Sequence, residues 1–445
     1  MEVRTWIEPV VAAAQLASSF YDTGLLLVAK NYYNHTAAAS ETNSENAQQK
    51  AISNFYIIYN LLQGLTPLLS AYALARLGDE KNRKISICVP LLGYLLSRTL
   101  LLLVILVPWP IEVMFGATVL HGLSGGFTTY WASVMAVGSQ HSSESRRSLR
   151  LIIIELIYGL AGFLGSVASG HLFVTFHLGY QQGTVLVSSS IALYAFCLFY
   201  SLFVLKVPKP AGSCPPASRD IDHPNSKLAD DEGDLAFQKT EHQHTLVPSK
   251  LIVAMLFVGA IMYDLAVAGA IDVLPLFLLK EPLSWGPEYI GYSYAAGYVI
   301  FITSFLGVFV FSKFLRDTSM IMIGIVSFAA GIFIMAFVRW TYLFYIARGV
   351  MLFALIPLPT IRSALSKHVE GSSYGKVFVL LQLALVVTGV VTSTVFNKIY
   401  QSTLDWFGGF SFLLSSGISC LSLIPISIIA YKQRTSSGSL EILTD

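Results

Sequence analysis

Twelve apolar stretches of about twenty residues each follow one another along the chain, and no other feature limits its possible folds as strongly. A stretch of this length crosses the ~30 Å hydrocarbon core of a bilayer as one helix. Charged residues make up only 12% of the chain, against the ~25% typical of soluble domains, and they fall mainly between the stretches. The pattern predicts an all-α membrane protein with twelve transmembrane helices.

The predicted helices form two sets of six, separated by a polar segment rich in Pro and Ser with an acidic run at residues 230–234. Such a segment cannot bury enough apolar surface to fold alone. We expect an N-terminal six-helix bundle at 1–205, a flexible cytosolic linker at 206–249, a C-terminal six-helix bundle at 250–431 and a cytosolic tail at 432–445. The predicted helices cover residues 8–29, 51–75, 85–107, 111–137, 151–175, 184–205, 250–279, 288–311, 317–338, 341–365, 373–397 and 406–431.

Two six-helix halves joined by a long middle loop are the layout of the major facilitator superfamily. In that superfamily the substrate site lies between the halves, near the middle of the membrane. We therefore expect the 6+6 pseudo-symmetric fold of the superfamily and a site between the two bundles.

Lys and Arg are distributed unevenly over the gaps between the predicted helices. Of the 28 such residues, 21 lie near the chain ends or in the gaps after even-numbered helices. The positive-inside rule therefore predicts that both termini are cytoplasmic. Asn34 begins an Asn-His-Thr glycosylation sequon in the first gap, on the opposite side. None of the four cysteines lies in a gap on that side, so we expect no extracellular disulfide.

The gap after the second predicted helix contains the run Gly-Asp-Glu-Lys-Asn-Arg-Lys at residues 78–84, which resembles the superfamily signature G-x-x-x-D-x-x-G-R-K. The acid and the basic pair match, whereas Asn82 replaces the second glycine. Asp79 can cap the third helix and pair with a basic residue of a neighbouring helix. We expect Asp79, Arg83 and Lys84 to form a conformational gate on the cytoplasmic side. The alternative is a basic loop that only sets topology.

Ionisable side chains within the predicted helices are the best functional signal, because each is costly in lipid unless it is paired or hydrated. Acids and an imidazole are candidates for proton coupling, because changes in hydration and in nearby charge alter their proton affinity. Arg348 and Arg362 offer sites for a carboxylate or a phosphate. The alternative is that these charges only pair with one another to hold helices together. The proton-coupling candidates are Glu155, His121, Asp264 and Asp22.

Other residues within the predicted helices complete the candidate set. Asp272 and His171 lie in the outer half, and we expect Arg98 of the third helix to have a structural or snorkelling role. Gly159, Gly162 and Gly165 recur at every third position and allow close approach of a neighbouring helix. Four tyrosines are candidates for contact with a substrate, with helix packing as the alternative: Tyr59, Tyr263, Tyr294 and Tyr298.

Enzymatic chemistry has no support in the sequence, which contains no phosphate-binding glycine loop, nucleophile elbow or metal-ligand cluster. Three histidines scattered through the linker, His223, His242 and His244, are typical of solvated side chains rather than of a metal site. We therefore expect that the protein is not an enzyme, that it needs no cofactor, and that H⁺ is its coupling ion.

Five segments resemble solute carrier family 46, the family of the proton-coupled folate transporter. The similarity covers the chain apart from the middle loop. The segments are Trp6–Pro9, Ala51–Tyr56, Ser148–Glu155, Asp272–Trp285 and Ile361–Lys367.

The resemblance implies carriage of organic anions, because the family includes carriers of folate, of conjugated anions and of bacterial muropeptides. It also implies that Glu155 is the proton-coupling acid and that Arg362 binds substrate. Val267, Thr118 and Ser284 stand where the folate transporter has a histidine, an arginine and a cysteine. These differences argue against folate itself as the substrate and against the family's extracellular disulfide.

We therefore expect a proton-coupled symporter of bulky organic anions, such as muropeptides or folate-like solutes, that works by alternating access. We expect a monomer in the plasma membrane or the endosome–lysosome membrane, with no nucleic-acid partner. The alternative is a receptor or scaffold with a transporter fold that moves no solute. Glu155, Arg348 and Arg362 favour the symporter, because a scaffold does not need them.

The predicted topology can be tested at Cys214 in a variant whose other three cysteines are replaced by serine. An impermeant thiol reagent should label Cys214 only after the cells are permeabilised, because the linker is predicted to be cytosolic. Asn34→Gln should abolish a glycosidase-sensitive shift in gel mobility. Labelling of Cys214 in intact cells would show that the linker is outside the cytosol and that the predicted topology is inverted.

Overall fold

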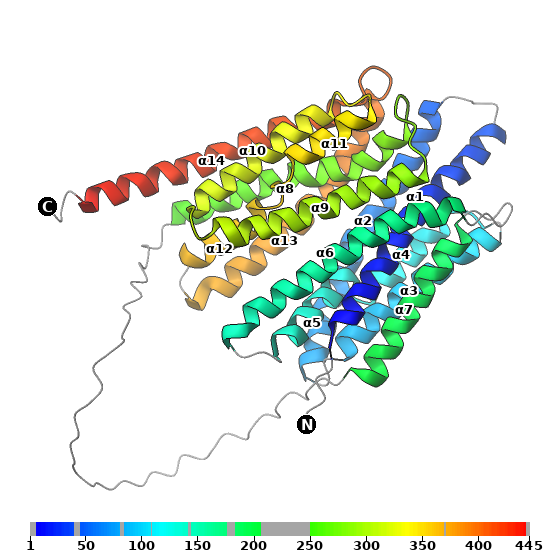
Figure 1. Cartoon of the computed structure of the whole chain (residues 1–445), viewed down its shortest axis with the longest axis horizontal. Helices are drawn as coiled ribbons and strands as arrows, with labels where there is room; N and C mark the ends of the chain where they lie inside the picture. Colours follow the sequence, from blue (N-terminus) through cyan, green and yellow to red (C-terminus); the bar gives the residue numbers. More distant parts are fainter. Residues whose placement is uncertain are drawn as a thin grey trace, which may run out of the picture.

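The computed structural model describes residues 6–39, 45–80, 84–107, 109–140, 144–175, 183–205, 250–368 and 371–441. These residues form helices joined by short turns, and no strand occurs among them (Figure 1). The elements are α1 Glu8–Ala39, α2 Glu45–Glu80, α3 Ile85–Leu106, α4 Val113–Leu123, α5 Gly126–Gln140, α6 Glu144–Thr175, α7 Thr184–Phe199, the π-helical turn η1 Tyr200–Val204, α8 Lys250–Leu279, α9 Pro287–Phe311, α10 Asp317–Met335, α11 Thr341–Val350, α12 Pro357–His368, α13 Gly371–Thr403 and α14 Phe410–Glu441.

Nine segments in the described part of the chain are long and apolar enough to cross a membrane. Three further crossings come from elements outside that set. α2 is long enough but carries polar side chains such as Asn60 and Gln63 within its span. Two other crossings are each divided into a pair of short helices, α4 with α5 and α11 with α12. The twelve crossings predicted from the sequence are therefore confirmed.

The two divided crossings are the fourth and the tenth, which are equivalent positions in the two halves. Gly125 and Gly126 form the first break, with φ angles of 101° and 55° that favour glycine. At the second break the Ser304 hydroxyl accepts the Leu355 N–H at 3.0 Å and donates to the Leu352 carbonyl at 3.0 Å. These hydrogen bonds replace helical ones, as an interrupted helix at membrane depth requires.

The helices pack in two groups, α1 to α7 and α8 to α14 (Figure 1). Between the groups, α6 packs along α9 and α2 packs along α13. Residues 206–249 lie outside the described residues, and so do Cys214 and the three linker histidines. The exact domain boundaries stay a prediction.

Glycines of α6 allow the two groups to approach closely. A Cβ atom on Gly162 would lie 2.3 Å from the Tyr298 ring, and one on Gly170 would lie 2.6 Å from the carbonyl oxygen of Pro287 at the start of α9. Both distances are too short for a real contact, so only glycine fits at these positions. Gly165 faces α1 instead. The close helix approach predicted from the glycine spacing is confirmed.

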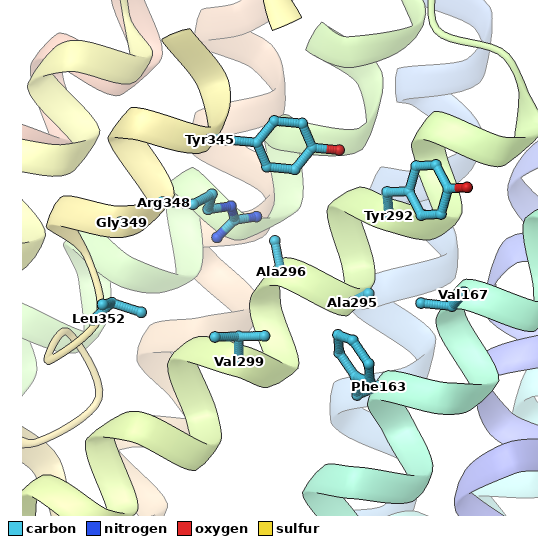
Figure 2. Close-up of a pocket in the computed structure, with 10 residues that line it drawn as sticks. All are labelled: Phe163, Val167, Tyr292, Ala295, Ala296, Val299, Tyr345, Arg348, Gly349 and Leu352. Atoms are coloured by element: carbon cyan, nitrogen blue, oxygen red, sulfur yellow. The ribbon is translucent and has the colours of Figure 1, made fainter. Parts of the chain in front are cut away.

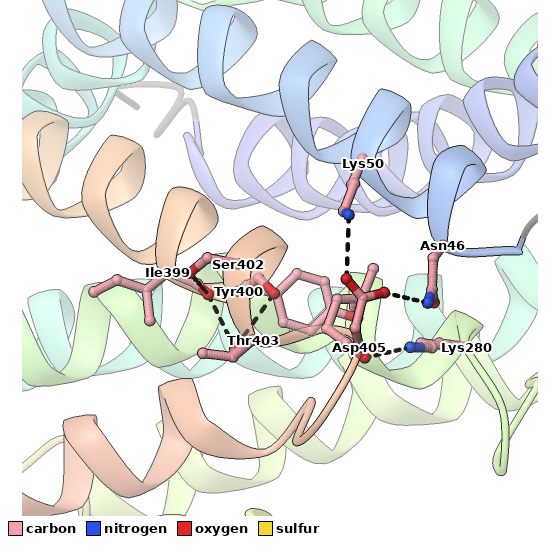
Figure 3. Close-up of polar contacts among 9 residues, drawn as sticks. Asn46, Lys50, Lys280, Ile399, Tyr400, Ser402, Thr403 and Asp405 are labelled. Carbon is pink, nitrogen blue, oxygen red and sulfur yellow. Dashed lines mark hydrogen bonds and ion pairs between the residues drawn. The ribbon is translucent and has the colours of Figure 1, made fainter.

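Polar contacts join the two groups at the end opposite the linker (Figure 3). Asp405, in the turn after α13, accepts a hydrogen bond from the Asn46 amide at 2.5 Å and pairs with Lys50 at 3.4 Å, both on α2. Lys280, which follows α8, holds the same turn by donating to the Leu404 carbonyl at 2.8 Å. The start of α2 is therefore tied to the second group of helices.

Further polar contacts extend this junction. Ser53 of α2 donates to Asn397 of α13 at 3.0 Å. At the other seam, the His171 ring of α6 lies 3.7 Å from Glu288 and 2.8 Å from the Tyr292 hydroxyl of α9. Both seams between the groups are thus joined at the end away from the linker.

The glycine contacts predict a position-dependent effect of added methyl groups. Gly170→Ala should lower the unfolding free energy by about 1–3 kcal/mol, because the backbone of α9 must move away from the new Cβ atom. Gly417→Ala is the matched control, because a Cβ atom on this α14 glycine meets nothing within 4 Å. Thermal unfolding of both purified variants checks this, and equal unfolding temperatures would contradict it.

Candidate functional site

A polar cavity of about 460 Å³ lies where α2 meets the second group of helices. Asp264 and Asp272 of α8, Arg362 of α12, and Gln382 and Ser393 of α13 line it. Arg362 donates a hydrogen bond to the Gln382 side-chain oxygen at 3.1 Å, and its charge interacts with that of Asp264. Asp272 is hydrogen-bonded to Ser393. We call this space the junction cavity; it brings together a cation and two acids.

A smaller cavity of about 210 Å³ lies inside the first group of helices. Asp22 of α1, Tyr59 of α2, Arg98 of α3 and His121 of α4 line this N-half cavity. Asp22 is exposed to it, and the charge of Arg98 acts on Asp22. The buried His121 ring lies 4.2 Å from the Tyr94 ring, and its Nε2 atom forms no hydrogen bond with the described residues.

Of the two roles expected for Arg98, structural or snorkelling, the buried side chain agrees with the structural one. Its side chain is only 4% exposed, and the guanidinium carbon lies 3.7, 4.6 and 5.2 Å from the ring centres of Tyr21, Tyr94 and Tyr194. Aromatic faces stabilise a cation in this arrangement.

Gln63 of α2 lines both cavities, so the two cavities are neighbours and this side chain lies between their sets of ionisable residues. Two candidate tyrosines of α9 approach the N-half cavity from the second half. Tyr294 interacts electrostatically with Asp22, and the Tyr298 hydroxyl accepts a hydrogen bond from Gln15 of α1. The structure therefore brings together Asp22, His121, Tyr59, Tyr294 and Tyr298 on one side and Asp264 with Arg362 on the other.

Three predicted site residues lie apart from both cavities. Tyr263 is fully buried and donates a hydrogen bond to the Ala354 carbonyl in the break between α11 and α12, so in this conformation it supports the backbone. Glu155 is partly buried on α6 and is absent from both cavity linings. Arg348 lines a separate apolar crevice.

Two basic residues close to predicted site residues contact other parts of the first group of helices. Arg150, one turn before Glu155, forms an ion pair with Glu8 at 3.5 Å rather than with Glu155. Lys84 donates to the Leu202 carbonyl at 3.1 Å within the first group. Arg83 and the side chain of Asp79 lie outside the described residues, so the predicted gate stays a prediction.

The predicted glycosylation residue lies at an accessible place. Asn34 is exposed near the end of α1 and accepts a hydrogen bond from Gln48 of α2. Its glycosylation stays a prediction.

Comparison with known proteins agrees with this architecture. Residues 12–393 match the model of the Major Facilitator Superfamily. Solute carrier family 46 member 2 of Canis lupus familiaris is 57% identical over 98% of this chain and 95% of its own length, and that of Mus musculus is 54% identical over 97% and 93%. The Gallus gallus protein SLC46A3, a "lysosomal proton-coupled steroid conjugate and bile acid symporter", is 33% identical over 91% and 87%.

Solved structures share the fold at low sequence identity. The D-xylose–proton symporter has a TM-score of 0.66 at 15% identity and covers 94% of this chain and 96% of its own. The POT family transporter PepTSo has a TM-score of 0.64 at 10% identity and covers 97% and 99%. These matches extend over nearly the whole length of each chain. The chain therefore belongs to the major facilitator superfamily of transporters and, within it, to solute carrier family 46.

Proposed function

We propose that this chain is a proton-coupled symporter of bulky organic anions, such as muropeptides or folate-like solutes. The observation that carries the proposal is the junction cavity, in which Arg362 lies with Asp264 and Asp272 between the two halves. Its volume of about 460 Å³ is within the ~300–1,000 Å³ typical of small-molecule sites. A guanidinium that can bind carboxylate or phosphate supports an anionic substrate.

The acids beside Arg362 supply a reason for coupling to protons. While Asp264 is ionised, it competes with a bound anion for the charge of Arg362. A proton on Asp264 removes this competition, so the anion and the proton bind together more favourably than either binds alone. Their joint release on the other side of the membrane is symport.

The N-half cavity offers a second set of groups for proton movement. Asp22 and Arg98 bear opposite charges there, and His121 has an unpartnered ring nitrogen within the described residues. Gln63 connects this set to the junction cavity. Glu155 belongs to the proposal through the family resemblance, and it lies one turn before Tyr158, which lines the N-half cavity.

The conformation supports alternating access. Two contacts join the halves at the end opposite the linker: Lys50 with Asp405, and His171 with Glu288. If both termini are cytoplasmic, as predicted, this is the inward-facing state. The opposite state then requires these contacts to open, and the loop residues Asp79, Arg83 and Lys84 are the proposed gate on the cytoplasmic side.

The relatives support the finer parts of the proposal. SLC46A3 of Gallus gallus, 33% identical, is described as a proton-coupled symporter of steroid conjugates and bile acids, which are amphipathic anions, and as lysosomal. We therefore propose a monomeric carrier in the endolysosomal or plasma membrane. A non-transporting receptor or scaffold is less favoured, because it gives no role to the charges that line the junction cavity.

The role of Arg362 predicts a loss of anion affinity. Arg362→Gln should raise KM for a labelled anion by about 10- to 100-fold, because a charge-assisted hydrogen bond contributes ~1.5–3 kcal/mol. Arg362→Lys should have a smaller effect. The measurement is uptake into vesicles of steroid sulfate, muramyl dipeptide and a folate analogue. Lys313→Gln, which removes an exposed charge after α9, is the control, and an unchanged KM in Arg362→Gln would exclude Arg362 from the site.

The acids predict a separation of coupling from exchange. Glu155→Gln, Asp264→Asn and Asp22→Asn keep the size of the side chain but cannot exchange a proton. Each variant at a coupling site should lose acid-driven accumulation of substrate while it retains substrate exchange between equal pools. Vesicles with an inward proton gradient measure the first property, and counterflow measures the second. A variant with normal acid-driven accumulation is not at a coupling site.

A further inference from the structure

A third cavity, an apolar crevice of about 500 Å³, lies between α6, α9 and α11 (Figure 2). Phe163 and Val167 of α6 form one wall, and Ala296 and Val299 of α9 form another. Arg348 is the one charged residue of its lining. The crevice shares no lining residue with the junction cavity or the N-half cavity.

The crevice opens toward the membrane rather than toward the centre of the protein. Successive residues of a helix are rotated by ~100°, so Ala296 lies on the opposite side of α9 from Tyr294, which approaches Asp22. Further along α9, Leu306 and Val310 lie on the same side of the helix as Val299 of the crevice, and they are 44% and 47% exposed. Exposed apolar side chains along a membrane-spanning helix contact lipid. Lipid can therefore enter the crevice from the side.

The charge of Arg348 has no acidic partner among the described residues. Figure 2 shows its guanidinium directed from α11 across the crevice toward α9. The Nε atom of Arg348 is buried without a hydrogen bond to the described residues. The guanidinium carbon lies 5.3 Å from the centre of the Phe344 ring. Arg348 lies about 10 Å along α11 from Thr341. A cation at this depth is costly unless an anion reaches it.

We propose that the crevice binds an anionic lipid from the leaflet at the end opposite the linker. The phosphate would pair with Arg348, and an acyl chain would lie against Phe163, Ala296 and Val299. Charge complementarity selects an anionic head group, and the apolar walls select a hydrocarbon chain. Trp340 and Tyr342, which are 57% and 62% exposed, mark the membrane interface at this level.

The position of the site gives the lipid an effect on conformation. One wall belongs to the first half of the chain, whereas α9 and α11 belong to the second half. The complete site exists only while α6 and α9 remain together at this level. A bound lipid therefore stabilises the conformation that is joined at the end opposite the linker.

The test is the thermal unfolding of the purified full chain in a neutral detergent with added lipid. Phosphatidylglycerol should raise the unfolding temperature by about 3 °C, and phosphatidylcholine should not. Arg348→Gln should lose this rise because the charge is removed. Ala296→Phe should lose it because the crevice is filled while Arg348 is kept. Arg339→Gln, which removes an exposed charge at the same end of the molecule, should retain the full rise.

Three outcomes would overturn the proposal. The first is an equal rise with phosphatidylcholine, which would show no selection for charge. The second is a full phosphatidylglycerol effect in Arg348→Gln or, if that variant does not fold, in Ala296→Phe. The third is an equal rise with inorganic phosphate, which would show an anion site that needs no lipid chain.

Discussion

The structure depends on one constraint: a charge within the membrane must be paired, hydrated or covered by aromatic rings. Arg98 meets this constraint through three tyrosines and Asp22, and Arg362 meets it through Gln382 and Asp264. Both arrangements place acids and bases around small polar cavities, and such cavities can exchange solutes and protons. The residues that accommodate charge within the membrane are therefore the same ones that are proposed to take part in transport.

The interrupted helices satisfy the same constraint for the backbone. The break after α4 ends that helix two residues beyond His121, and the Ser124 hydroxyl donates to the His121 carbonyl at 2.6 Å. The break after α11 precedes α12, which carries Arg362 in its second turn. Interrupted helices at equivalent positions of two repeats mark the binding region in many transporters. In this chain each break lies close to a titratable or charged residue of a cavity.

The positions of the helices could be predicted from the sequence, but the side of each helix that faces the centre of the protein could not. Long apolar stretches define the crossings regardless of their neighbours, so all twelve were predictable, including the polar α2 and the two broken crossings. The direction of a side chain depends on helix rotation and packing, which a single sequence does not report. Arg348 and Arg362 therefore looked alike in the sequence, yet one lines an apolar crevice and the other a polar cavity.

Arg98 and Tyr263 show the same limit in opposite directions. Arg98 was expected to have a structural or snorkelling role, yet its side chain also lines the N-half cavity. Tyr263 was a candidate for substrate contact with helix packing as the alternative, and its hydroxyl donates a hydrogen bond to the interrupted backbone at Ala354. An interrupted helix leaves carbonyl groups without helical partners, and buried polar side chains such as Tyr263 satisfy them.

The two seams between the halves differ in a way that suits a moving protein. The α6–α9 seam is fitted closely through Gly162 and Gly170, so it has no room for added volume at these positions. The α2–α13 seam ends in the Lys50–Asp405 pair, whose side chains are 43% and 59% exposed. An exposed ion pair of this kind stabilises the closed seam by only about 0–1 kcal/mol, so this pair alone does not hold the protein in one state. A ligand that binds one of the two states more tightly than the other shifts the equilibrium toward that state.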